Sequence, residues 1–269
     1  MDVIIDSECA LIPEETKPLI TQRNPLLNFL ISLGYESSRL PLADLLSRYH
    51  HLEGRWIILT PIYWQATHNN AMIVAAGDDL GISDERSQFF FERFAEYLKV
   101  EDIMLYYHDA STWLLSAKEM PLLNSPSAYQ LINHPLLPEL TALDATMHWQ
   151  KFFTESQMFF ASQFNEAEMN GVWMWGCDEL IIKKSLKIAT NQEFKVFADL
   201  CSQHVSIYDP TLNINSYDVL LLNSLDELTD THQQELKKAP VNWYWNNTAY
   251  SKNRTNWFTR FWRTFRHAD

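Results

Sequence analysis

The sequence predicts an α/β fold in which helices flank a mixed β-sheet. Segments with the apolar spacing of strands alternate along the chain with segments that have the spacing of helices, which is typical of a sheet with helices packed on it. The run 218–222, Asp-Val-Leu-Leu-Leu, is continuous and apolar after its aspartate, as in central or parallel strands. At 269 residues the chain can bury a sizeable core, and we expect 1–269 to form a single α/β domain.

Capping signals mark the helices. Pro25 stands at a position typical of a first helical turn, and Gly34 follows the last apolar residue of the same segment. Ser83 is followed by two acidic residues, which favours a helix that begins there and runs through Lys99. Helices are therefore predicted at 25–34, 42–50, 83–99, 148–164, 191–204, 226–238 and 256–267.

Short runs of β-branched and aromatic residues predict the strands. The run that begins at Arg55 is expected to end at Pro61, because proline lacks the N–H group that a strand ladder needs. The three residues 109–111 separate two strand-like runs and predict a hairpin. Strands are therefore predicted within the β-rich run 55–63, where Pro61 ends the strand, and at 72–76, 103–108, 112–117, 171–175, 218–222 and 242–245.

Two stretches lack these patterns. Residues 1–25 form a polar, proline-containing lead-in with one short apolar run. Residues 119–140 contain four prolines, which makes this stretch the best candidate for a loop or an internal boundary.

Composition excludes several classes of protein. Three widely spaced cysteines without a Cys-x-x-Cys pair argue against a disulfide framework or a structural zinc site. A formal net charge of −13 disfavours nucleic acid as a partner. The first residues lack the basic and apolar stretches of a secretory signal, and the apolar runs are far shorter than the roughly 20 residues of a membrane span. We therefore expect a cytoplasmic protein.

The end of the chain differs from the acidic remainder. Between 252 and 269, Asp269 is the one acidic residue, whereas five residues are lysine or arginine. Helical spacing over 256–267 would place aromatic side chains on one side of a helix and arginines on the other. Such a helix suits contact with a partner protein or a membrane surface; the alternative is a terminal helix folded onto the protein's own core. The candidate contact residues are Trp257, Phe258, Arg260, Phe261, Trp262, Arg263, Phe265 and Arg266.

Two anchors carry the most specific pattern in the chain: Thr154–Met158, and Asn170–Gly176, which reads Asn-Gly-Val-Trp-Met-Trp-Gly. Together they resemble the Glu-x-Gln-Met … Asn-x-x-Trp-x-Trp-Gly pattern of a bacterial family. Its members are labelled as cofactor-independent phosphoglycerate mutases or as regulatory proteins of a plant-pathogen virulence-regulation cluster. The resemblance implies a diverged relative of the phosphatase and phosphoglycerate-mutase fold. Weaker similarities, which extend it over about residues 35–180, lie at Leu40–Ala43, Trp56–Tyr63 and Trp113–Leu115.

The chain departs from that family pattern around the second anchor. Three glycines follow the tryptophans in the family, whereas this chain has Gly176, Cys177 and Asp178. The arginine that precedes the strand in the family is absent from residues 163–168 here. Both changes remove groups suited to binding an anion, which weakens a phosphate-binding role for this turn.

Three residues are candidates for catalysis. His148 and Glu155 are expected on one helix and could act as an acid–base pair. The alternative is a histidine at the edge of the core and a glutamate that is exposed or caps the helix. Cys177 could be a nucleophile only beside a base that lowers its pKa, and packing in a loop is the alternative.

Four residues of the two anchors are candidates for ligand binding. Gln157 and Asn170 could contact a ligand, or they could hydrogen-bond the neighbouring strand. Trp173 and Trp175 lie two apart on the predicted strand, so their rings point the same way. They could stack on a ligand, or they could form part of the core.

No metal site is expected from the sequence. A two-metal mutase needs clusters of aspartate and histidine beside a nucleophilic serine. The pairs His50-His51 and His108-Asp109, and the stretch Asp230–His232, do not form such a set. We therefore expect no cofactor, with a divalent metal only if the protein is an enzyme.

These observations favour a non-catalytic regulatory or assembly protein with a phosphoglycerate-mutase-like fold, which acts through contacts with a protein partner. The alternative is a metal-dependent enzyme that transfers or hydrolyses a phosphoryl group on a small phosphorylated metabolite. A second alternative is an adaptor that binds the membrane surface through residues 252–267.

Overall fold

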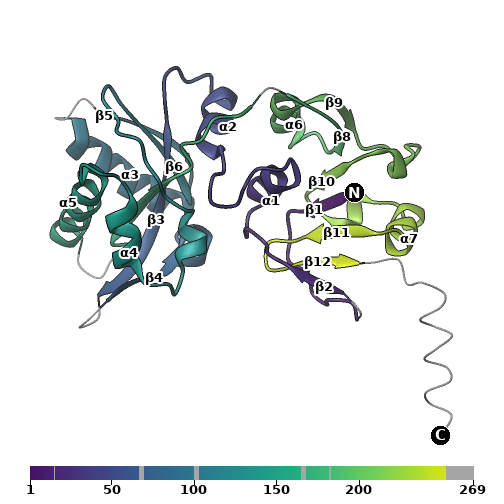
Figure 1. The fold of residues 1–269 in the computed structure, drawn as a ribbon, viewed down its shortest axis with the longest axis horizontal. Helices are drawn as coiled ribbons and strands as arrows, with labels where there is room; N and C mark the ends of the chain where they lie inside the picture. Colours follow the sequence, from purple (N-terminus) through teal and green to yellow (C-terminus); the bar gives the residue numbers. More distant parts are fainter. Residues whose placement is uncertain (15, 67–69, 100–102, 165–167, 182, 253–269) are drawn as a thin grey trace, which may run out of the picture. The chain divides into compact units, whose positions relative to one another are not determined.

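The chain has an α/β fold that divides into two compact units. Unit 1 consists of Met1–Leu33 and Ile182–Asp269, and unit 2 consists of Gly34–Ile181. Each unit has its own β-sheet (Figure 1), so the single domain and single sheet expected from the sequence are replaced by two of each. The computed structural model describes residues 1–14, 16–66, 70–99, 103–164, 168–181 and 183–252.

Unit 1 is built on a seven-stranded mixed sheet. Five neighbouring strands are parallel, and two antiparallel strands extend the sheet at one edge. In the order in which they pair, the strands are β2 (Lys17–Leu19), β12 (Ala249–Lys252), β11 (Val241–Tyr244), β1 (Asp2–Ile5), β10 (Val219–Leu222), β8 (Lys184–Thr190) and β9 (Ser202–Ile207).

The centre of this sheet is formed by β1 and β10. Val3 pairs with Leu220 and Ile5 with Leu222, and all four side chains are buried. The predicted strand at 218–222 is thereby confirmed in its central, parallel position. The expectation of a polar lead-in was wrong for β1, because a four-residue strand with parallel partners on both sides has little local signal.

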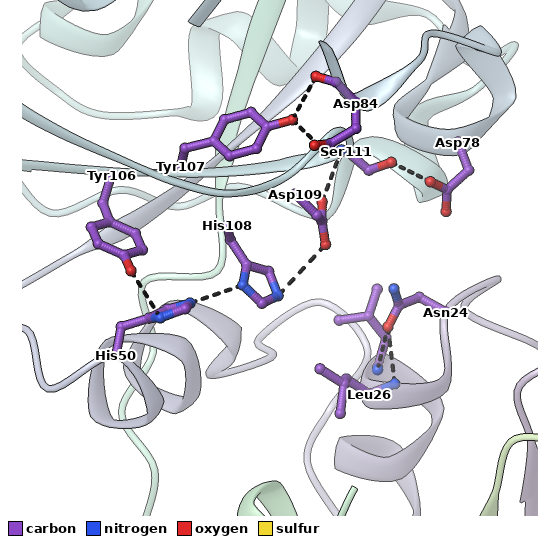
Figure 2. A network of polar contacts seen from close by, with 11 residues as sticks. Asn24, Leu26, His50, Asp78, Asp84, Tyr106, Tyr107, His108, Asp109 and Ser111 are labelled. Atoms are coloured by element: carbon purple, nitrogen blue, oxygen red, sulfur yellow. Dashed lines mark hydrogen bonds and ion pairs between the residues drawn. The ribbon is translucent and has the colours of Figure 1, made fainter. Parts of the chain in front are cut away.

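The helices of unit 1 are α1 (Pro25–Ser32), α6 (Lys195–Cys201) and α7 (Asp230–Lys238). α1 begins as predicted, and the Asn24 side chain accepts the backbone N–H groups of Leu26 and Leu27 (Figure 2). The predicted helix at 191–204 was wrong at its end, because the chain pairs with β8 from Ser202 onward and forms β9. Single 3₁₀ turns occur at η4 (Ile214–Ser216) and η5 (Leu225–Glu227).

Unit 2 is built on a five-stranded sheet in which every pairing is antiparallel. Its strands are β4 (Ala71–Ala76), β3 (Ile57–Ala66), β6 (Thr112–Ala117) and β5 (Ile103–Asp109) in that order, with β7 (Gly171–Trp175) also paired to β3.

The sequence predicted that the first strand of unit 2 ends at Pro61, and this prediction was wrong. β3 continues to Ala66. Its pairing with β6 ends at Leu59 and its pairing with β4 begins at Ile62, so Pro61 pairs only with β7. The proline is tolerated because it lies where β3 changes partners.

The helices of unit 2 enclose an aromatic core. Phe94 lies with its ring centre 5.4 Å from Phe159 and 5.2 Å from Phe160, and Phe153 packs edge-on against Trp173 at 5.6 Å. The helices are α2 (Leu42–Tyr49), α3 (Asp84–Leu98), α4 (Leu136–Ala142) and α5 (His148–Gln163), with 3₁₀ turns at η1 (Gly77–Leu80) and η3 (Ala128–Leu131).

The proline-rich stretch 119–140 lies inside unit 2, where it contains η3 and most of α4, so the boundaries between the units fall elsewhere. The predicted helix at 256–267 lies outside the described residues. Among the helices in the described part of the chain, none is both long enough and apolar enough to cross a bilayer.

Candidate functional site

Four side chains of unit 2 form a row of polar contacts, which we call the histidine relay: Tyr106, His50, His108 and Asp109 (Figure 2). The first two contacts are hydrogen bonds, and the third is a contact between an imidazole and a carboxylate. The Tyr106 hydroxyl lies 3.0 Å from His50 Nδ1, and His50 Nε2 lies 2.9 Å from His108 Nδ1. His108 Nε2 lies 3.5 Å from Asp109 Oδ2. The relay therefore connects α2 to β5 through side chains that are 58 residues apart in the sequence.

Local backbone geometry aims these side chains at one another. His50 is the residue that ends α2. Tyr106 and His108 lie two apart on β5, so both face the same side of the sheet. Asp109 would point to the opposite side in a regular strand, but the pairing with β6 shifts register after Tyr107, and the carboxylate reaches His108.

The Asp109 carboxylate favours one direction for the two hydrogen bonds of the relay. An ionised carboxylate only accepts, so it favours the His108 tautomer that carries its proton on Nε2, and this tautomer presents a lone pair on Nδ1 to His50. His50 then donates from Nε2 and accepts the Tyr106 hydroxyl at Nδ1. One added proton reverses the row: His108 donates from both nitrogens, and His50 donates to the Tyr106 oxygen. A second added proton would place two N–H groups face to face.

Burial sets the proton affinity of the relay. It lowers the pKa of His50, and the nearby His108 and His51 lower it further. Burial also lowers the pKa of His108, against the opposing charge of Asp109. For Asp109, burial raises the pKa while His108 lowers it. Both imidazoles therefore favour the neutral state in the folded protein.

The polar network continues past Asp109 into the turn between β5 and β6. Asp109 Oδ1 accepts the backbone N–H of Ser111 at 2.8 Å, and the Ser111 hydroxyl donates to the Asp78 carboxylate of η1 (Figure 2). Burial, followed by the charges of Asp78 and the neighbouring aspartates, raises the pKa of Tyr129, so this phenol stays protonated. The network thus links η1 to the turn that follows the relay.

Gly77 makes room for the Tyr129 hydroxyl. Its φ is +55°, and a Cβ at this position would collide with the phenol oxygen. A side chain is therefore excluded both by the backbone conformation and by the neighbouring ring.

The sequence does not predict the relay, although His50-His51 and His108-Asp109 stand out in it as adjacent pairs. His50 and His108 meet only through the packing of α2 near β5. One local feature of the sequence could have indicated two of the four relay residues: His108 and Asp109 are adjacent at a predicted hairpin turn.

His148 and Glu155 do not form an acid–base pair in the structure. His148 is exposed at the start of α5, where its ring touches Trp149. Glu155 lies 3.5 Å from Lys151 in an exposed ion pair one helical turn away. These positions fit the surface interpretation of both residues.

Asn170 lies beside β3, and Gln157 lies beside β7. The Asn170 side chain accepts the N–H of Trp64 at 2.9 Å and donates to its carbonyl oxygen at 2.8 Å, so it extends the ladder between β3 and β7. Gln157 packs against Gly171, and its buried Nε2 has no hydrogen-bond partner among the described residues. Asn170 therefore serves the sheet, as one of its two interpretations anticipated.

Trp173 and Trp175 belong to the core of unit 2. Both are buried, and their ring N–H groups donate to the Pro126 carbonyl at 3.0 Å and to the Thr60 hydroxyl at 2.8 Å. With their rings enclosed and their polar atoms satisfied, these tryptophans position β7.

A hollow of about 620 Å³ opens where β7 ends, and a neighbouring one of about 390 Å³ shares four of its lining residues. Gly176 leads into it with a φ of +73°, and a Cβ there would lie 2.9 Å from Ile58. Burial raises the pKa of the Cys177 thiol at its wall, and Asp178 raises it further, which argues against a thiolate nucleophile. The larger hollow is lined by Gly34, Tyr35, Glu36, Arg39, Arg55, Leu122, Cys177, Asp178, Glu179 and Ile181.

Comparisons with models of protein families, with curated proteins and with solved structures give no match for this chain. Within the described ranges, histidine, cysteine, aspartate and glutamate side chains form no group of three that could hold a metal ion. The relay itself does not fit a metal, because each ring nitrogen of His50 and His108 already has a protein partner.

The lowered pKa values make the relay a source of acid sensitivity. The unfolded chain binds protons on His50 and His108 near pH 6.5, whereas the folded chain resists them, so stability falls as the pH drops through this value. As the pH is lowered from 7, we expect the free energy of unfolding to fall less in the His50→Gln/His108→Asn variant than in the parent protein. Urea unfolding at a series of pH values measures this. Exposed His204→Gln is the control, and an unchanged pH dependence in the double variant would contradict the prediction.

Gly77 and Gly81 allow a matched test of the Tyr129 contact. Both have a positive φ, but no atom of the described residues lies within 4 Å of a Cβ at Gly81. Gly81→Ala should cost only the backbone penalty of about 1–2 kcal/mol. Gly77→Ala should cost about 1–3 kcal/mol more, because the ring must move. Urea denaturation gives both values; equal losses in the two variants would show that the ring contact has no effect.

Proposed function

We propose that this protein is a regulatory or assembly component that acts through protein–protein contacts and is a diverged relative of the phosphoglycerate-mutase-like family it resembles. The observation that supports this function is the hollow of unit 2. It opens directly after the second sequence anchor, at the residues where this chain departs from the glycines of the family.

The wall of the hollow supports binding of a protein surface. Leu122 is 81 % exposed and Ile181 is 65 % exposed, and both line the same concave space. Covering a large aliphatic side chain is worth roughly 1.5–3 kcal/mol. Charged groups surround them, a mixture typical of an apolar contact with a polar rim.

The proposal is tested by placing charges on the hollow. Leu122→Glu/Ile181→Glu should reduce by at least about tenfold the amount of each specific partner captured from a lysate of the producing cells, because a buried unpaired charge is costly in an interface. Quantitative mass spectrometry measures the capture. Leu11→Glu/Ile20→Glu is the matched control, since these residues of unit 1 are also well exposed, at 83 % and 79 %. Equal capture by both variants would contradict the proposal.

A second candidate function is phosphoryl transfer or phosphohydrolysis on a small phosphorylated metabolite. The histidine relay favours it, because imidazole and carboxylate groups in a row can move a proton near neutral pH. Asp109 is half exposed, so one end of the relay is open to solvent. The metal-dependent form of this function would need ligands outside the relay.

Phosphorus NMR of the protein with 3-phosphoglycerate, with and without Mn²⁺, tests this second function. Turnover that falls about 100-fold in His108→Asn, and not in exposed His204→Gln, would establish it, because loss of a general acid or base typically costs that much. No turnover in either condition would contradict it for this substrate class. The membrane-adaptor alternative concerns residues 252–267 and stays a prediction.

A further inference from the structure

The arginine side chains at the two hollows pair with carboxylate or carbonyl groups of the same chain. Arg39 donates twice to the Asp178 carboxylate, at 2.8 and 3.0 Å. Arg48, at the adjoining hollow, pairs with Asp44 at 2.8 Å. Arg55 donates to the Met120 carbonyl oxygen and lies beside the Cys177 sulfur. These arginines therefore brace the wall of the hollow.

Two other carboxylates line the larger hollow. Among the described residues, the side chains of Glu36 and Glu179 have neither an ion pair nor a hydrogen bond, and both are exposed. They flank the same space as Leu122 and Ile181. The hollow thus offers negative charge beside an apolar wall, and its volume of about 620 Å³ lies within the ~300–1,000 Å³ range of ligand pockets.

The sequence of this chain contains a segment of the complementary chemistry. Within 253–269 the stretch 257–263 reads Trp-Phe-Thr-Arg-Phe-Trp-Arg, so aromatic side chains alternate closely with Arg260 and Arg263. This segment is basic in a protein whose net charge is −13. Arginine suits paired contact with a carboxylate, and aromatic rings suit an aliphatic wall.

We propose that the hollow of unit 2 binds the segment 253–269 of a second copy of this chain. The inference rests on the proposed function, since it names the protein partner. Arg260 and Arg263 pair with Glu36 and Glu179, and the aromatic side chains cover Leu122 and Ile181. The local attraction opposes the general repulsion between two acidic chains, and it directs the segment to the hollow.

A charge exchange between hollow and segment tests this contact in the full-length chain. One variant carries Glu36→Arg/Glu179→Arg, and the other carries Arg260→Glu/Arg263→Glu. Self-association is measured by sedimentation velocity over a range of protein concentrations, at an ionic strength of about 0.1 M, where charges are screened beyond ~10 Å. Circular dichroism of each variant shows whether it is folded.

The expected result has two parts. Each variant alone should associate at least about tenfold more weakly than the parent, because like charges then meet at the hollow. An equimolar mixture of the two variants should associate to within about threefold of the parent, because each segment then meets a hollow of opposite charge. Restoration on mixing is not expected from variants that are merely misfolded.

Two outcomes would overturn the inference: a parent chain that stays monomeric at every concentration, or variants whose mixture associates no better than each alone. Either outcome leaves the proposed function standing if Leu122→Glu/Ile181→Glu still loses captured partners. If that double variant captures partners normally while the charge exchange fails, both proposals fall.

Discussion

The pairing of β3 with three neighbouring strands is the constraint on which the features of unit 2 depend. β7 pairs along Ile58–Ile62 and so delivers Gly176 and Cys177 to the hollow. β6 pairs with the start of β3, and it also pairs with β5, the strand that holds three of the four relay residues. β4 pairs at its end and leads into η1 with Gly77 and its aspartates. A shift of one residue in β3 would turn its side chains to opposite faces and separate these sites.

The relay and the hollow use charge in different ways. In the relay, three partly buried side chains form a row that begins at the half-exposed Asp109, so their protonation states are coupled along the row. At the hollow, Arg39 pairs with the Asp178 carboxylate and Arg55 donates to a backbone carbonyl oxygen, while Glu36 and Glu179 remain exposed to solvent. The first arrangement suits proton transfer or acid sensitivity, and the second suits recognition of a basic surface.

Unit 1 contributes a scaffold of another kind. Its central strands are covered on both faces, so Val3–Ile5 and Val219–Leu222 are apolar without alternation. The strands β12 and β2 close one edge with antiparallel pairs. This sheet brings residues near both ends of the chain side by side, since β1 lies between β10 and β11.

The sequence by itself determined the α/β class and the position of most elements, because capping and periodicity are local: Pro25, Ser83 and the run Val219–Leu222 all act within a few residues. It also indicated that Asn170 could serve the neighbouring strand. Only the tertiary structure decided that β1 is a central strand, that Pro61 lies within β3 and that Ser202 begins β9, because strand pairing supplies partners from far along the chain. The same holds for the relay, where His50 and His108 meet across 58 residues and no local pattern records their distance.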